Sequence, residues 1–171
     1  MIKQFVILAI LSIILGLASN AINSNGIPLI GDYRDLSSGD GPIIPPEAEE
    51  GDPPFIGIEL AQIEHAAAKS LFVDARDETE FECGTIPGSI NIPFDYLPEE
   101  NLEAYLDSAL GYISKDAPII TFCSGEECDL SLHLGRNLQA FGYTNVAIFF
   151  GGAREWENVG LDMERRVECG E

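Results

Sequence analysis

The central stretch of the chain, residues 117–129, reads APIITFCSGEECD. Its apolar run, Ile119–Phe122, is typical of a buried strand, and the run ends at Cys123. A polar loop follows, and then apolar residues at helical spacing predict a helix: Leu130, Leu134, Leu138 and Phe141. A thiol between a strand end and a helix N-terminus has its thiolate favoured by peptide dipoles and free N–H groups. This stretch alone leaves open whether Cys123 is a nucleophile or an ordinary buried cysteine.

The composition indicates one acidic globular domain. Of the 171 residues, 46% are hydrophobic, which is enough to form a core. The chain is too short for two domains of ordinary size. All 29 acidic residues and eight of the nine basic residues lie after Gly31, so residues 32–171 carry 21 more negative than positive charges. Such a surface repels nucleic acid and anionic lipid headgroups, and neither is expected as a partner.

The chain has four cysteines, which are too few and too scattered to predict a disulfide scaffold: Cys83, Cys123, Cys128 and Cys169. Cys83, on a short predicted helix, and Cys169, in a charged tail, appear in positions that suggest no function. Cys123 and Cys128 have four residues between them, but no second pair of ligands follows and both histidines are isolated. We therefore predict no metal site.

The N-terminal residues 1–22 are expected to form an apolar helix that acts as a transmembrane anchor or a signal peptide. The segment is uncharged after Lys3, and Ser19-Asn20-Ala21 is a passable cleavage site. We favour a single-pass anchor with the domain outside the cytoplasm, and the alternative is a secreted or periplasmic protein after cleavage. Residues 23–54 are rich in Pro, Gly and acidic residues, which predicts an extended linker, and residues 161–171 are expected to form a charged C-terminal tail.

From residue 55 to 160, strands and helices alternate along the sequence. This alternation predicts an α/β fold with a central parallel sheet flanked by helices. The expected strands cover residues 55–58, 71–75, 89–93, 119–122 and 146–150, and the expected helices cover 59–69, 78–83 and 98–114 besides the helix after the loop. In the first of these helices, three residues are expected to face the core: Leu60, Ile63 and Ala67. Ligands of such sheets bind at the carboxyl ends of strands, where Cys123 is expected to lie.

Three segments together resemble the rhodanese-like domain family. They are residues 72–93, FVDARDETEFECGTIPGSINIP, the strand that ends at Cys123, and residues 142–156 with GYTNV and GGAREW. The resemblance covers residues 55–160. It implies a sulfurtransferase in which the Cys123 thiolate takes a sulfane sulfur from a donor, holds it as a persulfide and passes it to a thiol acceptor. It implies no cofactor.

The residues after Cys123 form the expected active-site loop: Ser124, Gly125, Glu126, Glu127, Cys128 and Asp129. Its backbone N–H groups and the helix start can stabilise a thiolate or a persulfide anion, with Asp129 as the helix cap. The loop departs from the family in having Ser124 where a basic residue is usual, and in its two glutamates. These carboxylates oppose thiolate formation and repel a thiosulfate dianion, so neutral or cationic carriers or a protein persulfide are the expected donors.

Other residues of the signature are expected to support the site. Asp74 and Arg76 are expected to hold loops through hydrogen bonds and a salt bridge. Thr85 replaces a histidine common in the family, which is expected to remove a polar contact. The predicted roles of Asn91, Trp156 and the Gly151-Gly152 pair are structural, and His133 is expected to be exposed.

Cys128 leaves three functions open. It can approach Cys123 across the loop and form a disulfide, or it can pack at the helix start without a chemical role. The favoured function is a membrane-tethered sulfurtransferase that uses Cys123. The alternatives are a thiol–disulfide redox module that uses Cys123 with Cys128, and a catalytically silent rhodanese-like binding domain.

Overall fold

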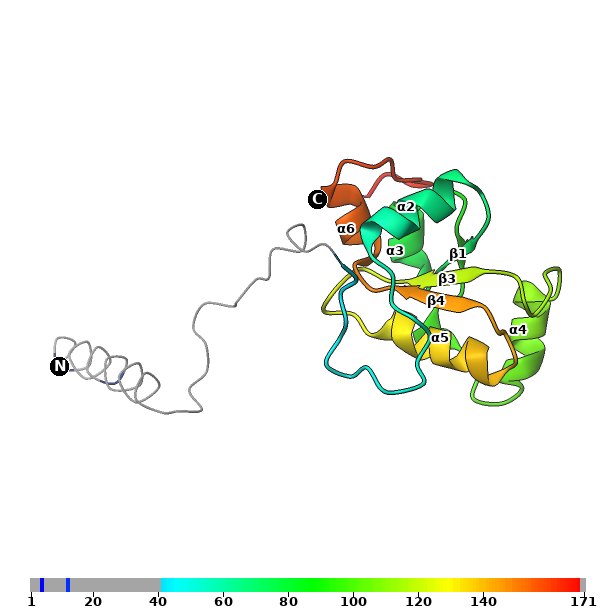
Figure 1. The fold of residues 1–171 in the computed structure, drawn as a ribbon. Helices are drawn as coiled ribbons and strands as arrows, with labels where there is room; N and C mark the ends of the chain where they lie inside the picture. The colour runs from blue at the N-terminus through cyan, green and yellow to red at the C-terminus, as the bar shows by residue number, and fades with distance from the viewer. Residues whose placement is uncertain (1–3, 5–11, 13–40, 170–171) are drawn as a thin grey trace. The chain divides into compact units, whose positions relative to one another are not determined.

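The computed structural model describes residues 4, 12 and 41–169. These contain the predicted parallel sheet, whose strand order is β2-β1-β3-β4 (Figure 1). The strands are β1 (Leu71–Asp74), β2 (Ile90–Asn91), β3 (Ile119–Phe122) and β4 (Val146–Phe149). All three strand pairs are parallel. The register aligns the last residues of the three long strands, since Asp74 pairs with Phe122 and Phe122 with Phe149.

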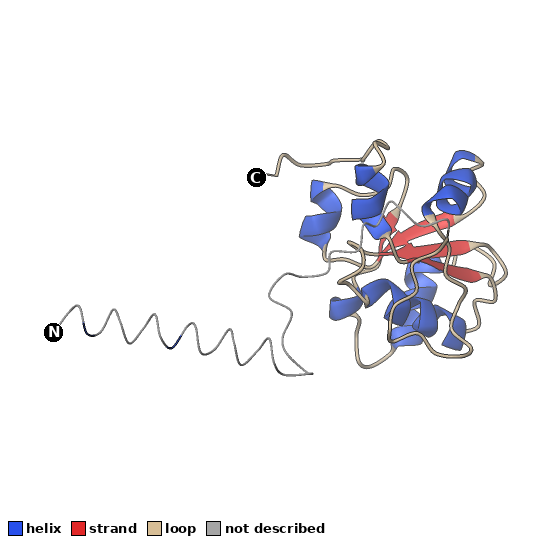
Figure 2. Ribbon diagram, turned by 60° about the vertical axis from the view of Figure 1, so that its left-hand side comes forward, coloured by secondary structure: helices blue, strands red, loops and turns tan. Residues whose placement is uncertain are grey.

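Helices cover both faces of the sheet (Figures 1 and 2). On one face lie α2 (Ile58–Ala66), α3 (Glu78–Cys83) and α6 (Gly152–Asn158). On the other lie α4 (Leu102–Leu110) and α5 (Leu130–Ala140), while the short 3-10 helix η1 (Phe94–Tyr96) follows β2. This arrangement confirms the predicted α/β fold with a sheet between two layers of helices.

Each layer of helices packs on the sheet through its own apolar cluster. The cluster under α4 and α5 contains fully buried leucines at the predicted spacings: Leu106, Leu110, Leu134 and Leu138. The cluster under α2 and α6 is mainly aromatic, and its buried rings include Phe72, Phe122, Phe149 and Trp156. The buried strand residues between them explain why β1, β3 and β4 read as continuous apolar runs in the sequence.

Helix α2 contradicts the predicted orientation of its apolar face. Leu60 and Ile63 are exposed, at 45% and 63% of their maximum, whereas Ala61 is fully buried. His65, on the same side as Ala61, packs edge-on against Trp156, and its Nε2–H donates to the carbonyl of Pro87 at 2.8 Å. The small side chain of Ala61 lets the helix lie close to the sheet, so the histidine takes a core position that a leucine was expected to hold.

Two other elements are shorter than the sequence predicted. Helix α4 begins at Leu102 rather than near Pro98, because Asn101 has a left-handed backbone with φ of 61°. The predicted strand at residues 55–58 is reduced to an isolated parallel bridge between Phe55 and Ile148. Helix α2 begins at Ile58 directly afterwards, so no room is left for a longer strand.

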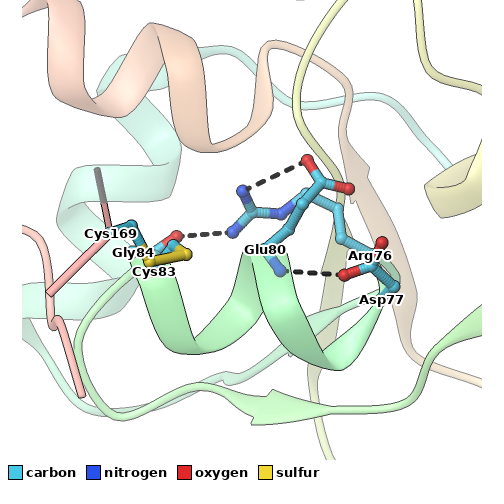
Figure 3. The surroundings of a disulfide bond; sticks show 6 residues. All are labelled: Arg76, Asp77, Glu80, Cys83, Gly84 and Cys169. Carbon is cyan, nitrogen blue, oxygen red and sulfur yellow. Dashed lines mark hydrogen bonds and ion pairs between the residues drawn. A yellow bond between two sulfur atoms is a disulfide. The ribbon is translucent and has the colours of Figure 1, made fainter. Parts of the chain in front are cut away.

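The C-terminal tail packs against the folded domain. Leu161 and Met163 pack against the aromatic cluster, and Glu164 forms an antiparallel bridge with Thr85. Cys169 is bonded to Cys83 at the end of α3, with 5.5 Å between the two Cα atoms (Figure 3). The expectation that these two cysteines have no role is therefore wrong, because the fold brings residues 86 positions apart into contact.

The last part of the predicted linker also contacts the domain. Residues 41–54 lie within the described part of the chain, and Pro45 and Pro53 are buried. Arg136 of α5 holds this segment through an ion pair with Asp52, at 2.6 Å, and a hydrogen bond to the carbonyl of Glu47. Asp52 therefore does more than keep the segment solvated.

The predicted N-terminal anchor or signal segment, residues 1–22, lies outside the described residues except for Gln4 and Ser12. Most of the linker, residues 23–40, lies outside them as well. In the part that is described, none of the helices combines the length and the apolar character that crossing a membrane requires.

Candidate active site

Cys123 follows β3 directly and lies at the carboxyl edge of the sheet. The start of α6 holds the first two residues after the strand. The N–H of Ala153 donates to the carbonyl of Cys123 at 2.8 Å, and that of Arg154 to the carbonyl of Ser124 at 3.0 Å. This close approach needs a glycine at position 152, where φ is 62°. A Cβ at this position would lie only 2.2 Å from the carbonyl oxygen of Cys123. The GG pair thus fixes the root of the loop.

The sulfur of Cys123 is enclosed by the loop and by α5. The residue is 0% exposed, and its thiol donates to the main-chain carbonyl of Cys128 at 2.9 Å. The hydroxyl of Ser131, itself fully buried, lies 3.4 Å from the sulfur. Burial, and then the hydrogen bond to the thiol of Cys128, raise the pKa of Cys123 far above its ordinary value. Hydrogen bonding by the hydroxyl and the backbone of Ser131 acts in the opposite direction, so the expected activation of this thiol at the start of α5 is outweighed by burial.

Cys128 has the environment that was expected for Cys123. The residue is only partly buried. Interaction with the Cys123 side chain is the largest cause that lowers the pKa of Cys128, to about 6, and hydrogen bonding by the backbone of Ser124 and Leu130 and by the Ser124 side chain acts in the same direction, against desolvation. Donors that converge on a sulfur favour its thiolate, so Cys128 is the more acidic thiol of the pair.

The rest of the loop is arranged around these two sulfurs. Gly125 has φ of 146°, and its carbonyl accepts from the N–H of Cys128 at 2.8 Å, which closes the turn. Glu127 is exposed and Glu126 is half-buried. Asp129 precedes α5, but its side chain makes no capping hydrogen bond and instead contacts Nε2 of His133 at 3.1 Å. The predicted capping role is therefore wrong, because the histidine one turn further along competes for the carboxylate.

His133 is half-buried rather than freely exposed as predicted. Its side chain keeps 38% of its exposure and stacks on the ring of Phe94, with 5.4 Å between centroids. The helical phase placed this residue beside the leucine stripe, and η1 covers it there. The sequence pattern contained no signal for that contact.

Asp74 and Arg76 are brought together at the end of β1, one strand away from Cys123. Asp74 is fully buried and accepts from Nε and Nη2 of Arg76, at 3.0 and 2.6 Å. The Thr85 hydroxyl donates to the same carboxylate at 2.8 Å, so Thr85 supplies a polar contact that we expected to be lost. Arg76 also donates to the carbonyl of Gly84 (Figure 3). These contacts tie β1 to the start of the segment that leads to β2.

Asn91 and Trp156 have structural contacts. The Asn91 amide donates to the carbonyls of Asp74 and Arg76, at 3.1 and 2.8 Å. The Trp156 indole is buried and its N–H donates to the carbonyl of Asp162 at 3.0 Å, which attaches the tail to α6.

Two residues beside the loop were not predicted to contribute to the site. Ser131 lies on α5, where its hydroxyl reaches Cys123. Glu155 of α6 is 6% exposed, and burial followed by the charge of Glu126 raises its pKa. Neither contact was predicted, because the spacing of apolar residues identifies the buried face of a helix but not the partners of its polar residues.

An open pocket of about 330 Å³ lies beside the loop. It is lined by Ser124, by the buried Arg76 and by Arg154 and Arg165, together with the carboxylates of Glu80 and Glu157. Three of the eight basic residues of the acidic domain therefore gather at this edge. They come from β1, α6 and the tail rather than from the loop, where the sequence analysis looked for them.

The sequence matches a known protein family. Residues 59–159 match the rhodanese-like domain. The chain belongs to the rhodanese-like domain family. One relative of this rhodanese-like domain is a sulfurtransferase, which supports a sulfurtransferase-type function.

Two curated relatives and one solved structure illustrate the family. The human thiosulfate:glutathione sulfurtransferase is 32% identical over 97 residues, which are 53% of this chain and 82% of that protein. An HTH-type transcriptional regulator of Mycobacterium tuberculosis is 29% identical over 104 residues, 61% of this chain, and the match spans only 42% of the regulator. The human single-domain sulfurtransferase superposes with a TM-score of 0.51 at 23% identity, covering 61% of this chain and 96% of that one, which shows a shared fold.

Proposed function

We propose that this rhodanese-like domain is a sulfurtransferase that carries sulfane sulfur as a persulfide on Cys123. The observation that carries the proposal is the position of Cys123 at the carboxyl end of β3, inside the segment that matches the family. Its enclosure by the loop would keep a bound persulfide away from solvent thiols. Arg76 lines the pocket beside the loop together with Ser124, which places a cation near the anions that the reaction forms.

The substrates are a sulfane-sulfur donor and a thiol acceptor. Sulfur transfer to a thiolate breaks the bond between the sulfane sulfur and the rest of the donor, and the donor leaves as a thiolate or an equivalent anion. The glutamates of the loop disfavour small dianions, so a neutral or cationic carrier or a protein persulfide remains our expected donor.

The proposal is tested by mass spectrometry of the full-length protein after exposure to a polysulfide. The wild type should gain the mass of one sulfur atom, which fragmentation places on Cys123, and should pass it to an added thiol. Cys123→Ser should lose transfer to the thiol. Ser108→Ala is the matched control, because it changes an exposed residue of α4 and leaves both loop thiols and the disulfide in place. A wild type that gains no sulfur, or a Cys123→Ser protein that transfers at the wild-type rate, would refute the proposal.

The alternative function, a thiol–disulfide module, is favoured by one observation. The Cys123 thiol contacts the main-chain carbonyl of Cys128 at 2.9 Å, so the loop brings the two cysteines together. In this case the protein should lose two hydrogens on mild oxidation, and changing either Cys123 or Cys128 should prevent the loss. Oxidation without any sulfur gain from polysulfide would favour this alternative over sulfur transfer.

We also propose that residues 1–22 anchor the chain in a membrane with the domain outside the cytoplasm. The uncharged segment after Lys3 and the Cys83–Cys169 disulfide support this, since disulfides persist in oxidising compartments. Alkylation of intact cells with a membrane-impermeant maleimide, after mild reduction, should label Cys169 if the domain lies outside. Labelling only after lysis would contradict the proposed orientation, and recovery of a shortened soluble chain would indicate cleavage.

A further inference from the structure

We propose that Cys128 is the entry thiol of the active site: it attacks the sulfur donor and then passes the sulfane sulfur to Cys123. This rests on the proposed function, because it describes how sulfur reaches the Cys123 persulfide. Within the family signature the sulfur would arrive at Cys123 directly. The arrangement of the loop in this chain gives the first step to the other cysteine.

The first argument is access. Cys123 is 0% exposed and is covered by the loop, whereas Cys128 is partly exposed at the start of α5. A donor molecule must bring its sulfur into line with the attacking thiolate. Since the Cys123 sulfur already contacts the main chain of Cys128 at 2.9 Å, the loop leaves no room for a donor there without moving.

The second argument is the set of hydrogen-bond donors. Interaction with the Cys123 side chain, and then hydrogen bonding by the backbone of Ser124 and Leu130 and by the Ser124 hydroxyl, lowers the pKa of Cys128. The Cys123 thiol instead faces a carbonyl oxygen, which can only accept and so keeps the proton on Cys123. A negative charge on the pair is thus stabilised at Cys128, and the thiolate is the attacking form of a thiol.

The chemical steps balance without an external oxidant or reductant. The Cys128 thiolate attacks the outer sulfur of a persulfide donor, R–S–SH, and the S–S bond of the donor breaks so that R–S⁻ leaves with the electron pair. Cys123 then attacks the outer sulfur of the Cys128 persulfide. The Cys123 proton, which is donated to the main-chain carbonyl of Cys128 before the reaction, moves to the departing sulfur of the same residue. The products are a Cys123 persulfide and a Cys128 thiol.

The experiment follows sulfur loading from a small persulfide donor, cysteine persulfide, in rapid-quench samples of the full-length protein. Fragmentation of the loop peptide then assigns the added sulfur to one cysteine. In Cys123→Ser, the sulfur should accumulate on Cys128 and move no further. In Cys128→Ser, loading of Cys123 should slow by about tenfold or more at pH 7, since the remaining thiol is largely protonated. A Ser124→Ala variant, which removes one donor from Cys128 and keeps both thiols, should slow capture to a smaller degree.

The outcomes separate this inference from the proposed function. Cys128→Ser loading at the wild-type rate would show that sulfur enters at Cys123, which overturns the entry role and leaves the sulfurtransferase intact. Absence of sulfur from both cysteines in the wild type would refute the proposed function itself. Sulfur that stays on Cys128 in the wild type, with no transfer to Cys123, would also overturn the relay. Equal circular dichroism spectra of the variants check that the loop change leaves the fold intact.

Discussion

The two loop thiols should titrate very differently, because their sulfurs face different groups. The pKa of Cys128 is lowered to about 6, against an ordinary value of about 8.5, whereas burial raises the pKa of Cys123. Charged groups also surround the pair: Glu126, Glu127 and Asp129 in the loop, His133 on α5 and Arg76 at β1. The lowered pKa means that Cys128 is mostly thiolate at neutral pH and loses this charge only as the pH falls through about 6.

Alkylation by iodoacetamide should therefore modify Cys128 first. Its rate should rise through pH 6 and level off near pH 7, while Cys123 should remain unmodified in the folded protein. Peptide mapping at a series of pH values measures both rates. Cys123→Ser should shift the alkylation profile of Cys128 to higher pH, because the variant lacks the thiol that contributes most to the lowered pKa of Cys128. A profile centred near pH 8.5 in the wild type would contradict the assignment.

Asp74 should be the most sensitive polar residue outside the loop. It is fully buried with the guanidinium of Arg76 and the hydroxyl of Thr85 on its carboxylate. Asp74→Ala leaves a buried cation without its partner, which should lower the free energy of unfolding by about 3–5 kcal/mol. Asp77→Ala is the matched control: this nearby carboxylate caps α3 through the N–H of Glu80, and its loss should cost about 1 kcal/mol.

Urea unfolding of the two variants measures the difference. If both lose the same small amount, the buried pair does not stabilise β1 and the segment before β2. A large loss in Asp74→Ala that Thr85→Val does not share would place the effect on the ion pair rather than on the hydroxyl contact.

At this scale the sequence predicted where residues lie better than what surrounds them. It predicted that Cys123 ends a strand and that Asp74 and Arg76 form a pair, because these follow from strand ends and from charge. It did not predict that the carbonyl of Cys128 faces the Cys123 thiol, nor that Thr85 reaches Asp74. Both contacts depend on the path of a loop backbone, which the residue types alone do not determine.

Helix α6 positions the loop through its first residues, so the glycine at its start should affect the active site. Gly152 has φ of 62°, and a Cβ there would lie 2.2 Å from the carbonyl oxygen of Cys123. Gly152→Ala should therefore displace the root of the loop and reduce sulfur loading by about tenfold or more, since small displacements of reacting groups cost about this much. Gly160→Ala is the matched control, with φ of 83° and no atom within 4 Å of its Cβ.

Both glycine variants should lose about 1–2 kcal/mol from backbone strain, and only Gly152→Ala should also lose activity. Stability by urea unfolding and loading by mass spectrometry separate the two effects. If the two variants load sulfur equally well, then contact between α6 and the loop is not needed to form the site.

The helices show what periodicity can determine. In α4 and α5 the apolar spacing identified the buried face, and Leu106 and Leu134 are fully buried there. In α2 the same rule failed, because Leu60 and Ile63 are exposed while Ala61 and His65 face the sheet. A short helix with apolar residues on several sides does not specify its own rotation. The aromatic cluster that it covers decides the rotation instead.

For the whole molecule, the sequence predicted the sheet and its helices but not the contacts that the segments on either side of the domain make with it. Proline and charge at the two ends suggested a free linker and a free tail. Instead Arg136 binds Asp52, and Glu164 pairs with Thr85. These contacts join residues far apart in the chain, and no local pattern announces them.

The Cys83–Cys169 disulfide should be the main link between the tail and the domain, and it should contribute much of the free energy of unfolding. It closes a separation of 86 residues, and it lies beside Arg76 and Glu80 at the end of α3 (Figure 3). Bonds that close loops of this size typically stabilise the folded state by about 2–5 kcal/mol. Residues 32–171 carry 21 excess negative charges, whose mutual repulsion destabilises the compact state. The disulfide opposes this effect.

Cys169→Ala should therefore lower the free energy of unfolding by about 2–5 kcal/mol, and Cys83→Ala with Cys169→Ala together should cost no more than that. Urea unfolding followed by the fluorescence of Trp156 suits the measurement, since this residue is the only tryptophan and its indole contacts the tail through Asp162. Dithiothreitol should destabilise the wild type by the same amount and leave the double variant unchanged. Wild-type stability in the double variant would show that the noncovalent contacts of Glu164 and Trp156 are sufficient to hold the tail.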